Sequence, residues 1–308
     1  MNIEYLKLFV RVATTNNISS AGAELGLSAA VASSHIRKLE ESLGVRLFHR
    51  TTRKISLTED GVAFLHHAED VIASVEAAEA SVGVGNLKPS GTLRVAAPAS
   101  FGRMHILPAM KGFMNEYPNL KIDLKLSDTI VDLVEGGFDI AIRNSQLKDS
   151  TLIAKKLVND RRILCASPEY ISKYGSPASP MELRDHNCIT LLNLDHWAFK
   201  GGNETLNIKV TGNFSTDNGE AIRDACSYGI GITVNSTWSA YQQLINGELV
   251  EVLSEYPLIS ETAIWAVYPS SRQLAPKVRA FIDYFSSYFN NEPYWDEKLK
   301  QHPQPHSV

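Results

Sequence analysis

Apolar side chains recur at helical intervals over residues 29–43 of this 308-residue chain. They stand at i, i+4, i+7 and i+11, as Ala32, Ile36, Leu39 and Leu43, so one face of the predicted helix is buried. Small and polar residues begin the opposite face, where the backbone can approach a groove closely and hydroxyls can bond to base edges or phosphates. The pattern predicts a helix suited to reading DNA.

A shorter helix is predicted over residues 20–25. Gly26 ends it, Ser28 is the expected N-cap of the next helix, and Gly26-Leu27 forms the turn between them. Residues 2–15 form a further helix whose apolar face braces the pair. The spacing is typical of a helix-turn-helix unit, in which the second helix enters the major groove.

Strand-forming residues and cations are mixed over residues 46–57, as a two-stranded wing along DNA phosphates requires. Between Ser34 and Ser56 six cations face two acids, a local charge of +4, although the whole chain carries −4. A solvated charged surface beside a purely structural helix pair is the alternative. Because turn, stripe and basic wing occur together, we predict a winged helix-turn-helix DNA-binding domain at residues 1–58. The predicted DNA contacts are Ser28, Ala29, Ala30, Ser33, Ser34, Arg37, Lys38, Arg50, Thr51, Arg53 and Lys54.

One long helix with Thr58 as N-cap is predicted from residue 59 to about residue 83. About 25 residues at ~1.5 Å each give a rod of roughly 37 Å, which is too long for the small DNA-binding domain to cover. A second copy of the chain is the expected partner, and two recognition helices would then fit a pseudo-palindromic site. Docking on the C-terminal part of the same chain is the alternative. With the turn-forming residues that follow, the helix and hinge occupy residues 59–91.

Strands and helices alternate over residues 92–290, which predicts α/β structure with parallel sheets. Two such runs joined by crossing strands predict two lobes, as in small-molecule binding proteins of the periplasmic type. We expect the first lobe at about 92–162 and 267–290, and the second at about 163–266. Residues 291–308 are predicted to be a flexible tail, with metal binding by its histidines as a weak alternative.

Ligands of open parallel sheets bind beyond the carboxyl ends of the strands. The loop at residues 98–102 follows the first strand of this region, and loops at 127–130 and 143–146 follow the next two. Their hydroxyls and a cation suit a small organic or aromatic acid, although capping or turn formation is an alternative role for each hydroxyl. The main predicted anchor is Arg143, for which pairing with a surface carboxylate is the alternative role. The predicted ligand-binding residues are Ser100, Phe101, Ser127, Thr129, Arg143, Asn144, Asn218 and Ser236.

The chain resembles the LysR-type transcriptional regulators over nearly its whole length, up to about Asn290. The N-terminal residues that carry the resemblance are Ser20-Ala21-Gly22, Leu25-Gly26-Leu27-Ser28, Ser33, Ile36, Leu39-Glu40, Leu43-Gly44, Arg46-Leu47-Phe48, Arg50-Thr51, Arg53, Leu57-Thr58 and Gly61. Later segments that carry it are Leu93–Pro98, Ile106-Leu107-Pro108, Asp139–Arg143, Gly229–Ile232 and Val267-Tyr268-Pro269.

The resemblance implies an α/β protein with a mainly helical N-terminal winged helix-turn-helix and a two-lobed domain that binds a small-molecule effector. It implies a sequence-specific transcription regulator that forms dimers, which pair into tetramers, and that contacts RNA polymerase if it is an activator. Ala30 and Ser34 stand where the family often has proline and arginine. We therefore expect base readout to use Ser33, Ser34 and Arg37, together with the wing and DNA shape.

Other function classes fit the sequence less well. No apolar run reaches about eighteen residues and no export signal begins the chain, so we expect a cytoplasmic protein without membrane contact. Three separated cysteines favour buried, inert thiols over a disulfide or a zinc site, with a redox-sensing thiol as the alternative. The sequence has no recognisable catalytic, cofactor or metal motif, so no enzyme is predicted. A solute-binding transport protein does not explain the basic module, whereas a ligand-free oligomerisation scaffold is a second interpretation of the C-terminal domain.

Overall fold

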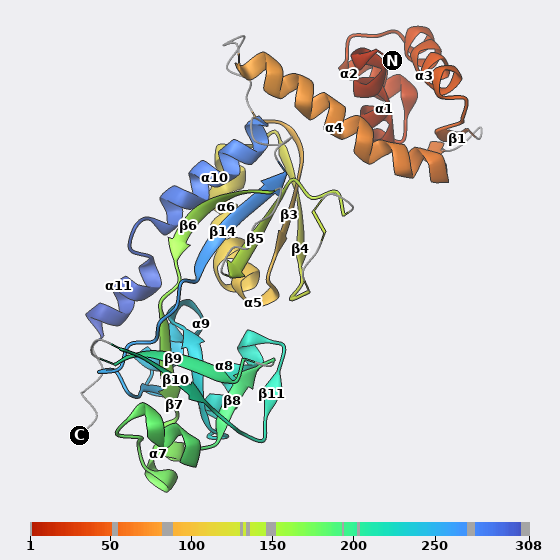
Figure 1. The fold of residues 1–308 in the computed structure, drawn as a ribbon. Coiled ribbons are helices and arrows are strands. Elements are labelled where there is room, and N and C mark those ends of the chain that lie inside the picture. Colours follow the sequence, from red (N-terminus) through yellow and green to blue (C-terminus); the bar gives the residue numbers. More distant parts are fainter. Residues whose placement is uncertain are drawn as a thin grey trace. The chain divides into compact units, whose positions relative to one another are not determined.

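The chain forms two compact units, Met1–Pro89 with Ser271–Arg279 and Ser90–Ser270 with Ala280–Val308. The computed structural model, shown in Figure 1, describes residues 2–50, 55–81, 89–129, 132–133, 136–145, 152–192, 194–201, 204–269 and 275–302.

The N-terminal unit is a winged helix-turn-helix, as predicted. Its elements are α1 (Ile3–Thr15), α2 (Ile18–Glu24), α3 (Ala29–Leu43), the antiparallel strands β1 (Phe48–Arg50) and β2 (Ile55–Leu57), and α4 (Glu59–Ser81). The Ser28 hydroxyl accepts a hydrogen bond from the backbone N–H of Val31 at 3.4 Å, which makes it the N-cap of α3. Gly44 ends α3 with φ 73°, a left-handed conformation that glycine adopts without strain. Thr58 caps α4, because its Oγ1 accepts from the N–H of Gly61 at 2.9 Å.

The core of this unit confirms the stripe on α3, since Ala32, Ile36 and Leu39 are fully buried. The apolar face of α4 corrects one prediction. Ala68 is buried, and three further residues of the helix, Phe64, Leu65 and Ile72, pack against the same core. The first half of α4 is therefore covered by its own domain and does not need a second copy there.

The first lobe of the C-terminal unit is built on a five-stranded sheet of order β4-β3-β5-β14-β6. Its strands are β3 (Gly91–Ala97), β4 (Leu120–Leu126), β5 (Ile140–Ser145), β6 (Leu152–Asn159) and β14 (Ala263–Pro269). As predicted, β3 is parallel to both β4 and β5. The sheet is nevertheless mixed, because β14 arrives from the second lobe and pairs antiparallel with β5 and β6. The first lobe accordingly resumes at Ala263, four residues before the predicted boundary.

The second lobe carries a sheet of order β11-β8-β12-β7-β13 and a separate hairpin of β9 and β10. Its elements are β7 (Arg162–Ala166), α7 (Pro168–Tyr174), a short helix at Pro180–Asp185, β8 (Cys188–Leu191), β9 (His196–Gly201), β10 (Glu204–Lys209), β11 (Ser215–Thr216), α8 (Gly219–Ser227), β12 (Ile232–Ser236), α9 (Thr237–Ile245) and β13 (Val250–Glu251). This sheet is also mixed, since β7 is antiparallel to β12 whereas β8 is parallel to it. The chain crosses between the lobes after β6 and again before β14.

The segment after β3 is helical at once, which corrects the predicted loop at 98–102. It comprises α5 (Ala99–Phe101), a π-helical turn (Gly102–Ile106) and α6 (Leu107–Glu116). The helix predicted at 130–136 lies mostly outside the described residues, of which 132–133 and 136 show no helix.

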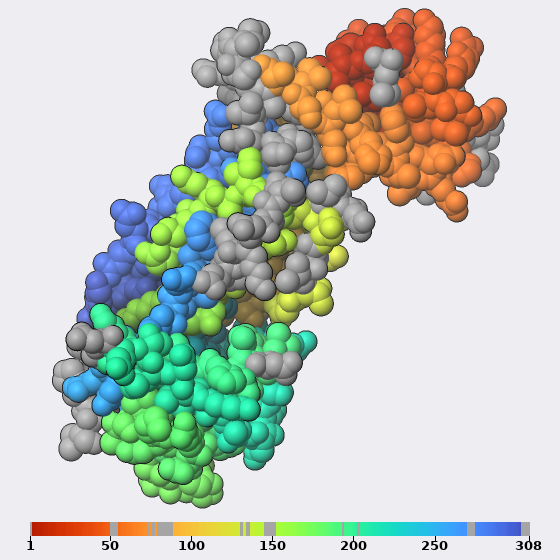
Figure 2. Space-filling model, viewed as in Figure 1, coloured from red at the N-terminus to blue at the C-terminus, as the bar shows by residue number. Residues whose placement is uncertain are grey.

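The C-terminal segment corrects the predicted flexible tail. After α10 (Pro276–Phe289), a further helix, α11 (Tyr294–Gln301), follows. Its Trp295 is 1% exposed, and Leu299 packs against the core of the second lobe. In Figure 2 the blue surface of the C-terminal helices runs along the first lobe towards the second. Both lobes therefore anchor α11, whereas residues 303–308 lie outside the described part of the chain.

His105, in the π-helical turn, connects the lobes through two hydrogen bonds. Its Nε2 lies 3.1 Å from the carbonyl oxygen of Trp238, and its Nδ1 lies 2.7 Å from the hydroxyl of Tyr294. Because a carbonyl only accepts, Nε2 carries the proton and Nδ1 accepts from the hydroxyl. Burial lowers the pKa of His105 from 6.5 to about 4, so the folded protein holds it neutral.

We expect the free energy of unfolding to fall as the pH is lowered from 6.5 towards 4. In this window the unfolded chain protonates His105 and the folded chain does not, so the loss is on the order of 3 kcal/mol. Urea unfolding of the wild type and His105→Gln at pH 7 and pH 4.5 measures the effect. The variant is expected to lose less stability between the two pH values, and an equal loss in both proteins would contradict this role of His105.

Candidate functional site

The outward face of α3 has the properties expected of a recognition helix. Its exposed positions include Ala29, Ala30 and Arg37, whereas Ser33 and Ser34 are half-buried. Arg37 lies 3.7 Å from Glu41 through Nε and Oε1, and both side chains are exposed. Two further predicted contacts, Ser28 and Lys38, are also exposed.

Val31 is an exposed apolar residue on this helix that sequence reasoning missed. Its side chain is 41% exposed although it lies in the first turn of α3. An aliphatic side chain there can contact a thymine methyl group in the major groove. The sequence did contain a signal for this exposure. Val31 directly precedes Ala32, which belongs to the buried face of the helix, so its own side chain points in a different direction.

The wing is held against the recognition helix by Glu40. Its Oε1 accepts hydrogen bonds from the backbone N–H groups of Leu47, at 2.9 Å, and Phe48, at 3.2 Å. This carboxylate therefore connects the start of β1 to α3. Arg50 ends β1, whereas Thr51, Arg53 and Lys54 at the hairpin tip lie outside the described residues.

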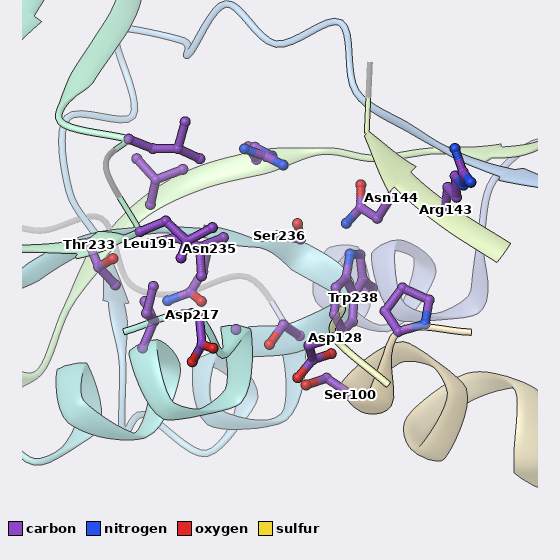
Figure 3. Close-up of a pocket in the computed structure, with 18 of the residues that line it drawn as sticks. Ser100, Asp128, Arg143, Asn144, Leu191, Asp217, Thr233, Asn235, Ser236 and Trp238 are labelled. Atoms are coloured by element: carbon purple, nitrogen blue, oxygen red, sulfur yellow. The ribbon is translucent and has the colours of Figure 1, made fainter. Parts of the chain in front are cut away.

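A cavity of about 490 Å³ lies between the two lobes of the C-terminal unit. Figure 3 shows side chains of both lobes around it, including Ser100 and Asp128 from the first lobe and Asp217 and Asn235 from the second. Its polar lining residues are Ser100, Ser127, Asp128, Thr129, Arg143, Asn144, Arg162, His196, Asp217, Thr233, Asn235, Ser236 and Ser239. Its larger apolar ones are Ile142, Ile189, Leu191, Leu192, Leu194, Trp197, Ile222, Val234 and Trp238. A cavity of this size and mixed lining is suited to a small organic molecule.

Six of the eight predicted ligand-binding residues line the cavity: Ser100, Ser127, Thr129, Arg143, Asn144 and Ser236. Phe101 does not, because it is fully buried and its ring contacts those of Trp238 and Trp295. Asn218 does not line it either. Its Oδ1 caps α8 by accepting from the N–H of Ala221 at 2.9 Å, and its Nδ2 donates to Asp128 Oδ2 at 2.6 Å. The sequence therefore assigned to the site one residue that lies in the core, Phe101, and one that caps a helix, Asn218.

The polar residues of the cavity wall differ in how far the protein itself satisfies them. The buried hydroxyls of Ser100 and Ser239 have no hydrogen-bond partner among the described residues. Arg143 likewise forms no ion pair within the described part of the chain. Asp128, in contrast, is engaged on both oxygens, since Oδ1 accepts from the N–H of Ala99 at 2.9 Å and Oδ2 accepts from Asn218. The unpaired groups of the cavity wall therefore include a cation, which can pair with a carboxylate.

Comparison with known proteins decides the family. Residues 3–62 match the bacterial regulatory helix-turn-helix protein of the lysR family, and residues 86–290 match the LysR substrate binding domain. This chain belongs to the LysR-type transcriptional regulators. It is therefore a DNA-binding transcription regulator with an effector-binding domain.

Two curated relatives and two solved structures illustrate how closely this LysR-type regulator follows its family. The HTH-type transcriptional regulator DmlR of Escherichia coli K12 is 34% identical over 92% of this chain and 93% of its own. The HTH-type transcriptional activator TtdR of the same strain is 33% identical, over 92% of each chain. The structure of CrgA from Neisseria meningitidis has a TM-score of 0.61 at 31% identity, covering 94% of this chain and 100% of that one. The full-length AphB structure from Vibrio cholerae has a TM-score of 0.57 at 30% identity, with 94% and 99% covered. The relatives are named as transcriptional regulators and not as enzymes.

The described residues contain neither a membrane-spanning helix nor a cluster of metal ligands. No helix among them is both long and apolar enough for a membrane span. Within the same residues, no three His, Cys, Asp or Glu side chains are grouped so that they could hold a metal ion.

Arg162 is a charged cavity residue that sequence reasoning missed. It begins β7, where its Cα pairs with that of Ser236 at the end of β12. The antiparallel pairing places the start of one strand beside the end of the other, so both side chains reach the cavity. The site of this LysR-type regulator therefore contains two arginines, Arg143 and Arg162.

All three cysteines of the LysR-type regulator are buried as free thiols, namely Cys165, Cys188 and Cys226. Burial raises the pKa of Cys188 to about 12. The pKa of Cys226 is raised mainly by a hydrogen bond with Cys165 and, to a smaller extent, by burial. Thiols in such surroundings have little thiolate and react slowly, which favours the inert role over the redox-sensing one.

We expect Cys188 in the folded protein to resist alkylation by iodoacetamide at pH 8. With a pKa of about 12, only about one thiol in ten thousand is ionised at that pH. Peptide mass spectrometry after timed labelling measures the rate of alkylation. The control is the same chain in about 6 M urea, which unfolds most domains and exposes their core. Labelling of Cys188 at similar rates in both conditions would contradict the prediction.

Proposed function

We propose that this regulator binds a pseudo-palindromic promoter site through α3 and the β1–β2 wing, and that a small carboxylate-bearing effector in the interlobe cavity modulates its DNA binding or activation. The observation that carries the effector part is the cavity of about 490 Å³ in which Arg143 has no ion-pair partner among the described residues. An acid would supply the opposite charge with which Arg143 can pair.

The proposed DNA-binding state is a homodimer or homotetramer. Two copies of α3 spaced by one or more helical turns would contact the two halves of the site. LysR-type regulators form oligomers, and Ile72 is the last residue of α4 that is seen to pack on the core of its own domain among the side chains that the structure describes. We place the protein in the cytoplasm, where it would meet DNA and, if it activates transcription, RNA polymerase.

Footprinting of genomic fragments at near-physiological salt tests the DNA part of the proposal. We expect a protected pseudo-palindrome upstream of a gene. Protection that disappears uniformly as salt is raised, without a preferred site, would contradict sequence-specific binding.

Variants of the DNA-facing surface are expected to separate affinity from sequence preference. Arg50→Ala and Arg53→Ala remove phosphate contacts, so they should weaken binding to all duplexes and lower the salt slope by about 1 each. Ser33→Ala should change the preferred base more than the overall affinity. Fluorescence anisotropy against the footprinted duplex and a scrambled one measures both quantities. The control is Lys7→Ala on α1, where Lys7 pairs with Glu4. If Ser33→Ala weakened binding to both duplexes equally, the proposed role of Ser33 in sequence preference would be contradicted.

Calorimetric titration of the full chain with acetate, succinate and benzoate tests the effector part. We expect saturable binding of at least one acid and weaker binding of the corresponding amide, because only the acid can pair with an arginine. If none of these acids binds, the C-terminal domain is better interpreted as a ligand-free oligomerisation scaffold.

A further inference from the structure

Asp160 lies where the chain first crosses between the lobes, directly after β6 and two residues before Arg162 takes part in β7 pairing. Its side chain is fully buried. Its Oδ2 accepts hydrogen bonds from Arg162 Nε at 3.2 Å, Ser236 Oγ at 3.1 Å and Thr262 Oγ1 at 3.0 Å. Thr262 immediately precedes β14, so one carboxylate oxygen contacts both segments that connect the lobes.

Asn144, at the end of β5, completes this group. Its amide has one orientation that satisfies both neighbours, with Nδ2 donating to Asp160 Oδ2 at 3.1 Å and Oδ1 accepting from Trp238 Nε1 at 3.1 Å. The donors to Asp160 therefore come from β5 in the first lobe, from the start of β7 and the end of β12 in the second, and from the second crossing segment. A neutral side chain could not accept from all of them with the same strength, because hydrogen bonds to an ionised group are roughly twice as strong.

Asp160 acts behind the cavity wall and not in it. Arg162, Ser236 and Asn144 line the cavity, whereas Asp160 does not. Arg162 is a quarter exposed and is bound to Asp160 through Nε, and it forms no other hydrogen bond among the described residues. Its terminal N–H groups are the ones that bind a carboxylate in the two-pronged geometry typical of arginine.

We propose that Asp160 is the positioning residue of the effector cavity and that Arg162, held by it, is a specificity-determining residue for an acid. The inference rests on the proposed function, since it requires a carboxylate in the cavity. Asp160 orients the guanidinium of Arg162 through Nε, and it also accepts from the amide of Asn144 and the hydroxyl of Ser236. The remaining N–H groups of Arg162 and Asn144 are thereby oriented before the ligand arrives, whereas the single O–H of Ser236 already donates to Asp160. This orientation lowers the entropic cost of binding the ligand.

The test compares acids with their matched neutral amides in the full-length protein. Acetate, succinate and benzoate are titrated calorimetrically against acetamide, succinamide and benzamide. Asp160→Asn keeps the shape of the side chain and removes its charge, and Asp123→Asn, an exposed carboxylate on β4 that is 64% exposed, is the matched control. Arg162→Gln is compared with Arg161→Gln, because Arg161 is the adjacent residue, pairs with Glu251 and does not line the cavity.

We expect Asp160→Asn and Arg162→Gln each to weaken binding of the acid roughly 10- to 100-fold, the range of a lost charged hydrogen bond. Binding of the amide should change less than about threefold, so the preference for acid over amide collapses. Neither control should alter this preference. A melting curve of each variant accompanies the titration, and Arg162→Gln tests the same contact even if Asp160→Asn fails to fold.

Four results would overturn the inference. Equal losses of acid and amide affinity in Asp160→Asn would mean that the residue only maintains the fold. Tighter acid binding in that variant would mean that Asp160 repels the ligand and does not position its partner. If no acid binds the wild type, the proposed effector and this inference fall together, whereas an acid that binds equally well to wild type and Arg162→Gln removes the inference alone.

Discussion

Replacing Trp295 by alanine is expected to lower the free energy of unfolding of the C-terminal unit by about 3–5 kcal/mol, the range found for large aromatic side chains in cores. Trp295 is 1% exposed, and its ring lies 4.5 Å from that of His105 and 5.6 Å from that of Phe289, centroid to centroid. Truncation would leave a cavity between α11 and the first lobe. Urea unfolding followed by far-UV circular dichroism measures the loss without depending on tryptophan fluorescence.

Tyr228→Ala is the control for this experiment. Tyr228 is also a large aromatic residue, but it is 78% exposed, so its loss should cost less than about 0.5 kcal/mol. If the two substitutions had similar effects, α11 would not be anchored by Trp295, and the tail would behave as the sequence first predicted.

The prediction of a flexible tail was wrong for residues 294–301, because α11 is specified by distant residues. Its eight residues, YWDEKLKQ, include few apolar side chains and many charges, so no helical stripe is visible in the sequence. The surface that covers Trp295 comes from Phe101 and His105, nearly two hundred residues earlier in the chain. Tertiary packing of this kind stabilises short helices that local sequence does not predict.

Local signals account for what was predicted correctly in the N-terminal unit. The buried stripe of α3, the cap at Ser28 and the glycine at position 44 each depend on residues within a few positions of one another. The antiparallel strand β14 depends instead on where the chain re-enters the first lobe, which sequence spacing does not determine. The parallel pairing of β3 with β4 and β5 could be predicted from the sequence. Parallel neighbours need a connection of about a dozen residues or more, and the segments between these strands are that long.

The candidate cavity shows the same division. The rule that ligands bind beyond the carboxyl ends of parallel strands found Ser127, Arg143 and Ser236, which all line the cavity. It missed Arg162, because this residue begins a strand and reaches the cavity only through its antiparallel pairing with β12. It misplaced Phe101 because the chain turns into a helix directly after β3, which directs that side chain into the core.

Arg143→Gln is expected to weaken binding of an acidic effector roughly 10- to 100-fold, as the loss of a charged hydrogen bond does. Its Cα pairs with that of Trp265 in the middle of the sheet, so the backbone position is fixed by β14 and does not depend on the side chain. Because Arg143 has no ion-pair partner among the described residues, its removal should leave the free energy of unfolding within about 0.5 kcal/mol of the wild type. Calorimetric titration with acetate, succinate and benzoate, together with urea unfolding, measures both quantities.

The matched control is Arg184→Gln, which removes an exposed arginine that does not line the cavity. It should change neither the affinity for acids nor the salt dependence of their binding. Arg143 and Arg162 line the same cavity, so their effects need not add, and the double variant distinguishes two models. If both arginines bind one carboxylate, the double variant loses little more than either single one. If a dicarboxylate is held at both ends, each single variant loses part of the affinity and the double variant loses the sum. Unchanged acid binding in Arg143→Gln would exclude Arg143 as an anchor in either model.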